Sequence, residues 1–240
     1  MTEQTAGPEK ASILEDFVDV FLSPVALFRR RADGRFGVAI LVFMIAGAVL
    51  YFATRNAMQP VWDAEFDRGM AAALKANPQM TQEQMEAGRK IAGTFGAVFV
   101  VIGAPIAALM LGFVVSIVGK LLGSSLGFGQ GFAIGAYSLF PRLFEGVAGA
   151  LQATRLDPAS ITSRMSVSLG VGRFLDPDQT NPMLFALAGR IDVFTLWVTL
   201  LIGIGFKVIG KMSTGQAALG AVIVWFVGAL PALFQAFRAM

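Results

Sequence analysis

Long uncharged apolar runs, separated by polar segments, dominate the pattern along this chain. A helix needs roughly 20 apolar residues to cross a hydrocarbon core of about 30 Å. Five segments approach or exceed that length, at residues 36–53, 91–119, 127–152, 184–209 and 216–237. Backbone groups in lipid must find partners within the chain, and a helix provides them inside one segment. The pattern therefore predicts an all-α, polytopic membrane protein with about five transmembrane helices.

A shorter segment, residues 1–35, precedes the transmembrane domain predicted for residues 36–240. Apolar residues recur in it at near-helical spacing with acidic residues between them, and Ser23-Pro24 is a natural break. This pattern predicts two short amphipathic helices. One interpretation is a cytoplasmic docking surface for a partner. We favour an interfacial anchor whose basic cluster meets anionic headgroups at the membrane surface, formed by Arg29, Arg30, Arg31 and Arg35.

The distribution of basic residues predicts the orientation in the membrane. Lys120 lies between the second and third spans, and Lys207 and Lys211 lie near the connection between the fourth and fifth. These lysines and the N-terminal arginines fall on one side, which the positive-inside rule assigns to the cytoplasm. We therefore expect a cytoplasmic N-terminus, an external C-terminus, and external loops at residues 54–90 and 154–182.

The two predicted external loops differ in character. In the first, Pro60 to Leu74 has the pattern of a short amphipathic helix. Thr81 followed by Gln84 fits a capping box, so a helix can run from there into the second span as a stalk beyond the membrane. The second loop is rich in Asp, Pro and Ser, which predicts irregular structure or a lid over the outer ends of the third and fourth spans.

The amino-acid composition excludes several classes of binding and catalytic site. The chain is 55% hydrophobic and 15% charged, and its net charge of +3 is too small to indicate nucleic-acid binding. It has no Cys and no His, which excludes disulfides, thiolate nucleophiles, imidazole bases and most zinc or haem sites. We expect no catalytic residue, cofactor or metal. An intramembrane enzyme remains the weakest alternative, because Ser124, Ser125 or Ser138 would have only Lys120 as a nearby base.

Four charged residues lie inside the predicted third and fourth spans, where an ionisable group is costly and normally faces a partner or water. At 1.5 Å per residue, Arg142 and Asp192 both lie about 21 Å from the cytoplasmic face, with Glu145 and Arg190 at about 26 and 24 Å. We therefore expect Arg142 to pair with Asp192 and Glu145 to pair with Arg190. We favour a role in fixing helix register, and an ion or substrate path is the alternative.

Small residues predict a close helix contact in the third span. Gly127, Gly131 and Gly135 recur every four residues and would line one face of a helix. Such spacing lets helix backbones approach closely. The sequence leaves open whether this seam closes within the chain or against a second subunit, and we favour the former. It also leaves the oligomeric state open.

Several segments together resemble the Yip (Ypt-interacting protein, or Yip-domain) family of membrane proteins in its bacterial form. The resemblance covers most of the chain and is reinforced by the five-span layout with a cytoplasmic N-terminus. It rests on Phe21-Leu22-Ser23-Pro24 followed by Phe28, Ala136-Tyr137 with Phe140-Pro141, Asp192-Val193-Phe194 with Trp197, and the stretch from Gly203 and Gly205 through Ser213.

The resemblance implies a non-catalytic scaffold in the bacterial inner membrane. Eukaryotic relatives bind Rab-type GTPases, but their Asp-Leu-Tyr-Gly-Pro type motif is absent here, so that role does not transfer. Some bacterial relatives occur alongside ABC-type export systems. The leading interpretation is thus an accessory subunit that contacts lipids and other membrane-protein subunits, with an ABC-type exporter as a candidate partner. The alternative is a small transporter or channel that uses the four intramembrane charges.

Overall fold

The computed structural model describes residues 12–238, so the predicted N-terminal segment is described only from residue 12 onward. Its regular elements are helical. In chain order they are α1 (Ile13–Leu22), α2 (Pro24–Arg30), α3 (Gly37–Ala76), α4 (Gln82–Leu121), α5 (Phe128–Ser138), α6 (Pro141–Ala153), the 3-10 helices η1 (Pro158–Ser160), η2 (Arg164–Val167) and η3 (Val171–Phe174), α7 (Pro182–Ala188), α8 (Val193–Val208), α9 (Thr214–Val227) and α10 (Leu230–Arg238).

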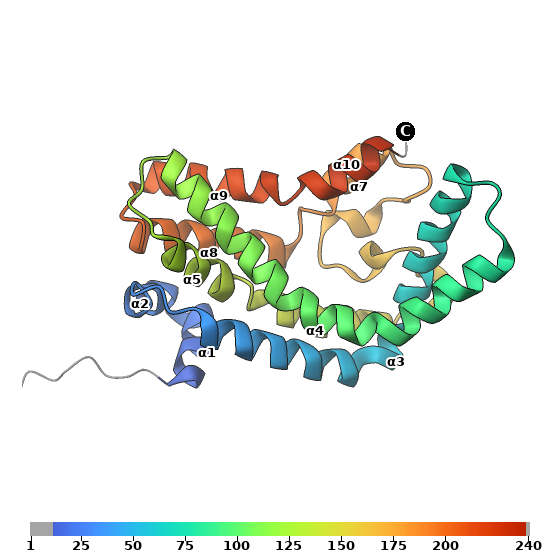
Figure 1. Cartoon of the computed structure of the whole chain (residues 1–240), viewed down its shortest axis with the longest axis horizontal. Helices are drawn as coiled ribbons and strands as arrows, with labels where there is room; N and C mark the ends of the chain where they lie inside the picture. The colour runs from blue at the N-terminus through green and yellow to red at the C-terminus, as the bar shows by residue number, and fades with distance from the viewer. Residues whose placement is uncertain (1–11, 239–240) are drawn as a thin grey trace, which may run out of the picture.

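The two longest helices, α3 and α4, have 40 residues each. Each is about 60 Å long at 1.5 Å per residue, twice the thickness of a hydrocarbon core. The segment predicted as a separate helix from Pro60 to Leu74 is continuous with the first span. Pro60 lies inside α3, where it removes one backbone hydrogen bond, and Figure 1 shows that α3 changes direction along its length.

The predicted start of α4 is confirmed. The Thr81 amide donates to Gln84 Oε1 at 3.0 Å, and the Gln84 amide donates to Thr81 Oγ1 at 3.3 Å. This reciprocal pair satisfies donors that the first turn of a helix leaves free. From there α4 runs without interruption into the second predicted span.

Three helical segments of the described chain are long and apolar enough to cross a membrane: Gly37–Ala76, Gln82–Leu121 and Thr214–Arg238. The predicted third span is divided between α5 and α6, and the predicted fourth between α7 and α8. At 16 residues, α8 is about 24 Å long, shorter than a typical core. The all-helical class with apolar spans is confirmed, whereas the number of five spans stays a prediction.

The interruptions have local causes. At the α5–α6 junction the Leu139 and Phe140 amides bond to carbonyls three residues back, and Pro141 opens α6 because it has no amide to donate. Before α8, Asp192 leaves the helical conformation and accepts hydrogen bonds from the Phe194 and Thr195 amides. Asp192 is therefore an N-cap rather than an interior residue of a continuous helix.

Two separate apolar clusters stabilise the molecule. The larger one joins α1 to α5 with α8 and α9, and its fully buried side chains include Phe28, Phe140 and Phe206. The smaller one joins α3 and α6 to the segment that follows α6, and contains Val61, Ala153, Ile161 and Val167. Figure 1 shows α1 and α2 at one end of the bundle and the η1–η3 segment with the second half of α3 at the other.

Candidate functional site

The four charges predicted inside the third and fourth spans have partners other than those expected. Arg142 forms an ion pair with Glu145 on its own helix, and its guanidinium also donates to Thr195 Oγ1 at 2.8 Å. The Arg190 guanidinium donates to the Trp225 carbonyl at 3.1 Å, and the Trp225 indole donates back to the Arg190 carbonyl at 3.2 Å.

The pairs Arg142 with Asp192 and Glu145 with Arg190 are therefore not formed among the described residues. The reason is that Asp192 is used as the cap of α8, and Arg190 lies in the turn before that helix, where it reaches α9. The prediction matched the charges by their depth along two straight helices. It is wrong because both predicted helices are interrupted next to these charges.

The glycines of the predicted seam lie against α4. A Cβ on Gly135 would lie 2.6 Å from the Gly112 nitrogen, and one on Gly131 would overlap the Ser116 hydroxyl and lie 3.0 Å from the Gly112 carbonyl oxygen. These two positions require glycine because the backbones of α4 and α5 approach so closely. Gly127 does not take part in this approach and is the N-cap of α5.

Ser124 and Lys120, two residues of the intramembrane-enzyme alternative, contact other groups of the chain. The Ser124 hydroxyl donates to the Gly210 carbonyl at 2.8 Å, and the Lys120 ammonium lies 3.8 Å from the centroid of the Phe128 ring. The Ser138 hydroxyl is buried without a hydrogen-bond partner among the described residues. Among the described residues, no three His, Cys, Asp or Glu side chains are grouped so that they could hold a metal ion.

The predicted basic cluster divides into two parts. Arg29 and Arg35 are exposed, and Arg35 is bound to Asp33 at 3.0 Å. Arg30 and Arg31 instead turn toward the bundle. Arg31 Nε donates to Asp16 at 2.7 Å, and Arg30 donates to Asp16 at 3.2 Å and to Asp19 at 2.6 Å. Of the four arginines predicted to face headgroups, only Arg29 and Arg35 are therefore exposed.

Asp16 is the centre of a buried polar network that the sequence analysis missed. Its side chain is 4% exposed, and it also accepts a hydrogen bond at 3.1 Å from the Tyr137 hydroxyl of α5. Burial opposes the charge of Arg30, but hydrogen bonds and attraction from Asp19 and Asp16 outweigh it and raise its pKa. The Arg30 guanidinium thus stays charged, and the network fastens α1 and α2 to the bundle.

At the opposite end of the bundle, residues 154–181 fold into a small loop subdomain that includes η1, η2 and η3. Its turns are fixed by side-chain caps: Asp157 accepts from the Ala159 amide at 3.0 Å, and Ser163 accepts from the Met165 amide at 3.2 Å. Two contacts tie it to α3. The Arg164 amide donates to Glu65 at 2.7 Å, and Arg68 donates to Asp178 at 2.7 Å.

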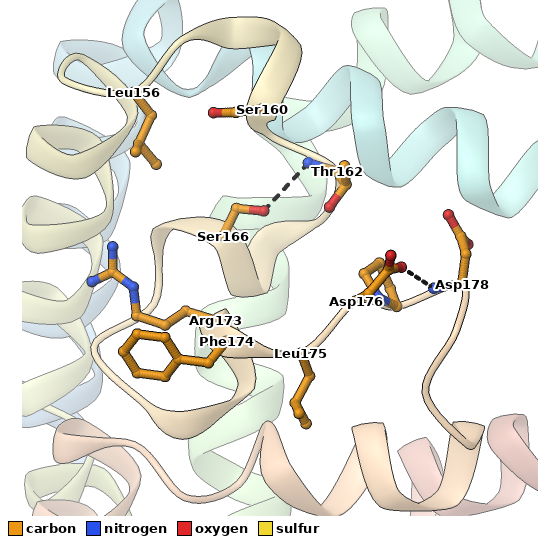
Figure 2. A pocket seen from close by; sticks show the side chains of 10 residues that line it. Leu156, Ser160, Thr162, Ser166, Arg173, Phe174, Leu175, Asp176 and Asp178 are labelled. Atoms are coloured by element: carbon orange, nitrogen blue, oxygen red, sulfur yellow. Dashed lines mark hydrogen bonds between the residues drawn. The ribbon is translucent and has the colours of Figure 1, made fainter.

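The loop subdomain surrounds a cavity of about 430 Å³. Figure 2 shows Arg173 and Phe174 on one side of it and Asp176 and Asp178 on the other, with the hydroxyls of the η1–η2 region above. Phe174 is 82% exposed, although it is large and apolar. Phe174 therefore projects from a loop that is itself folded, next to Arg173 and the cavity.

The comparisons with known proteins agree with the sequence patterns. A family model described as the Yip1 domain matches residues 18–234. No curated protein and no solved structure is significantly similar to the chain. The matched region covers α2 to α9 completely and includes the Asp16 partners Arg30, Arg31 and Tyr137, together with the loop subdomain. With a family match over most of its length and helices that can cross a bilayer, the chain belongs to the Yip1-domain family of membrane proteins.

Proposed function

We propose that this protein is a non-catalytic membrane scaffold, an accessory subunit that binds a larger membrane complex through its loop subdomain. The observation that carries the proposal is the exposed Phe174 on a loop that is itself folded. Loops of this length without long helices or strands are uncommon in compact domains and are usually functional or disordered. This one is held by caps, by the cluster around Val61 and by polar contacts to α3.

A fixed loop is a better docking surface than a mobile one, because less conformational entropy is lost when a partner binds. Truncating Phe174 would leave the fold intact, since its side chain makes little contact with the rest of the chain. Arg173 lies beside it, with its guanidinium carbon 5.7 Å from the ring centroid. Phenylalanine and arginine are both enriched at the cores of protein interfaces relative to the rest of the surface.

The partner class that we propose is a membrane complex, with an ABC-type exporter as the candidate suggested by the family resemblance. We also propose a bacterial inner-membrane location with the N-terminal helices in the cytoplasm, which places the loop subdomain outside. The distribution of Lys120, Lys207 and Lys211 supports that orientation.

The geometry favours a scaffold over a small transporter. The charges that a transport path would use are bonded to neighbouring groups of the same chain: Arg142 to Glu145 and Thr195, and Arg190 to Trp225. Neither arginine lines the loop cavity or the cavity between α3 and α4.

The test is a pull-down of the tagged protein from its native membrane in mild detergent, followed by mass spectrometry. The wild-type protein should retain a stoichiometric membrane partner, and Phe174→Ala should lose most of it. Phe99→Ala is the matched control, because Phe99 is 67% exposed but lies on the apolar part of α4. A protein that purifies alone, or loses its partner equally in both variants, would refute a docking site at Phe174.

A further inference from the structure

A second cavity, with both charged and apolar lining residues, lies between α3 and α4 and shares no lining residue with the loop cavity. Its volume is about 520 Å³, and its walls include Tyr51, Trp62, Asp63 and Phe66 of α3 with Arg89 and Gly93 of α4. We call it the α3–α4 cleft. The uncharged run of α3 ends at Ala53, two residues before Arg55, so the cleft extends across the boundary between the apolar and polar parts of this helix.

Aromatic rings form one wall of the α3–α4 cleft. The rings of Tyr51 and Trp62 stack with centroids 5.1 Å apart and an interplanar angle of 21°. The Arg89 guanidinium lies over the Phe66 ring, with its central carbon 4.7 Å from the ring centroid. Trp and Tyr are enriched where lipid headgroups meet water, and aromatic faces attract ammonium groups.

The rim of the cleft carries both signs of charge. Asp63 accepts hydrogen bonds from Arg89 at 3.1 Å and from Gln59 at 3.2 Å, and Arg89 also pairs with Asp67. Two carboxylates around one guanidinium give a local formal charge of −1. The Asp63 and Arg89 side chains are 45% and 51% exposed, so both can still reach a ligand. A headgroup with a cation and an anion would match this rim.

Glycines keep the floor of the cleft open. Among the described residues, a Cβ added to Gly93 would meet nothing within 4 Å, and one on Gly96 would lie 3.1 Å from the Tyr51 hydroxyl. Val100 continues the same wall one turn further along α4, into its apolar part. The cleft therefore changes from charged at the rim to apolar along α4, as an amphiphile does along its length.

We propose that the α3–α4 cleft binds the headgroup of a zwitterionic phospholipid. The lipid ammonium would lie between the Asp63 carboxylate and the faces of Trp62 and Tyr51, with the phosphate toward Arg89. An acyl chain would follow Gly96 and Val100 into the bilayer. This inference is independent of the proposed docking role of Phe174, which lies in the loop subdomain.

The experiment uses the full-length protein in nanodiscs that contain equal amounts of phosphatidylethanolamine and phosphatidylglycerol, with native mass spectrometry of the lipid that stays bound. The wild-type protein should retain phosphatidylethanolamine preferentially. Gly93→Leu fills the cleft and should lower that retention about tenfold, equivalent to losing one desolvated cation–π contact and part of an ion pair. Asp63→Asn should remove the preference for the ammonium-bearing lipid.

The matched control is Gly103→Leu. Gly103 lies on the same helix, has nothing within 4 Å of its Cβ position among the described residues, and does not line the cleft. It should retain phosphatidylethanolamine like the wild-type protein, and both variants must keep the wild-type thermal unfolding midpoint. Equal retention of the two lipids by the wild-type protein, or equal retention by the two leucine variants, would overturn the proposal.

Discussion

Two ion pairs at opposite ends of the bundle lie in different surroundings. Arg31 Nε lies 2.7 Å from Asp16 at the N-terminal end, and Arg68 Nη1 lies 2.7 Å from Asp178 at the loop subdomain. The Asp16 side chain is 4% exposed, whereas that of Asp178 is 76% exposed. Solvent screens the second pair and hardly reaches the carboxylate of the first.

Burial and the number of partners therefore decide how much each ion pair contributes to the stability of the fold. Asp16 has two arginines and the Tyr137 hydroxyl, so its loss would leave two half-buried cations without their main counter-charge. Asp178 has one partner on a surface where water can replace it. We therefore expect the N-terminal end to depend on its charges and the loop subdomain to depend on its apolar contacts.

The largest effect is expected for Asp16→Asn. The amide keeps the volume but removes the charge that compensates Arg30 and Arg31, which should lower the free energy of unfolding by about 3 kcal/mol. Asp19→Asn should cost only about 1 kcal/mol, because Asp19 pairs with Arg30 alone. Titration with a denaturing detergent, followed by far-ultraviolet circular dichroism, measures both values.

A double variant distinguishes the stability lost through an unpaired charge at this site from the stability lost through altered packing. Replacing Asp16 by Asn and Arg31 by Met removes one half-buried cation together with the carboxylate, so stability should recover part of the loss seen in Asp16→Asn. If Asp16→Asn is as stable as the wild-type protein, the network does not fasten α1 and α2, and the contrast between the two ends disappears.

An intermediate effect is expected for Val61→Ala in the smaller apolar cluster. Val61 is 2% exposed, and the removal of two buried methyl groups should cost about 2 kcal/mol with the cavity that remains. Hydrogen exchange should accelerate in residues 154–181 and stay unchanged in α1 and α2. Val49→Ala is the control, because Val49 lies on the same helix but is 64% exposed. Acceleration at both ends would mean that the clusters unfold together.

Hydropathy and local capping signals predicted the long helices well. The uncharged runs at residues 36–53 and 91–119 lie inside α3 and α4, and the Thr81–Gln84 capping box marks the start of α4. Apolar runs and capping boxes involve residues that are close together in the chain, so they can be recognised from the sequence alone. The same method joined α5 to α6 and α7 to α8, because an averaged apolar window does not register the single residues that begin a new helix, here Pro141 and Asp192.

The Asp16 network was missed for a different reason. Acidic residues between apolar ones were interpreted as the polar face of an amphipathic helix. Asp16, however, lies four residues before Val20 and thus on the same stripe, and both residues are buried. That spacing, together with Arg30 and Arg31 after the Ser23-Pro24 break, was the sequence signal that could have indicated a buried and paired Asp16. The contact with Tyr137, 121 residues away, depends on tertiary packing that no local pattern encodes.

The smallest effect is expected for the exposed pair at the loop subdomain. A double-mutant cycle with Arg68→Gln and Asp178→Asn should give a coupling energy of about 0.5 kcal/mol or less, which falls further in 1 M salt because the Debye length is then only about 3 Å. The same cycle with Arg31→Gln and Asp16→Asn should give a value several times larger that changes little with salt. Both cycles need only thermal unfolding midpoints at two salt concentrations. Equal coupling energies at the two ends would show that burial does not strengthen the N-terminal pair, and would remove the physical basis for treating the N-terminal network as a structural fastening.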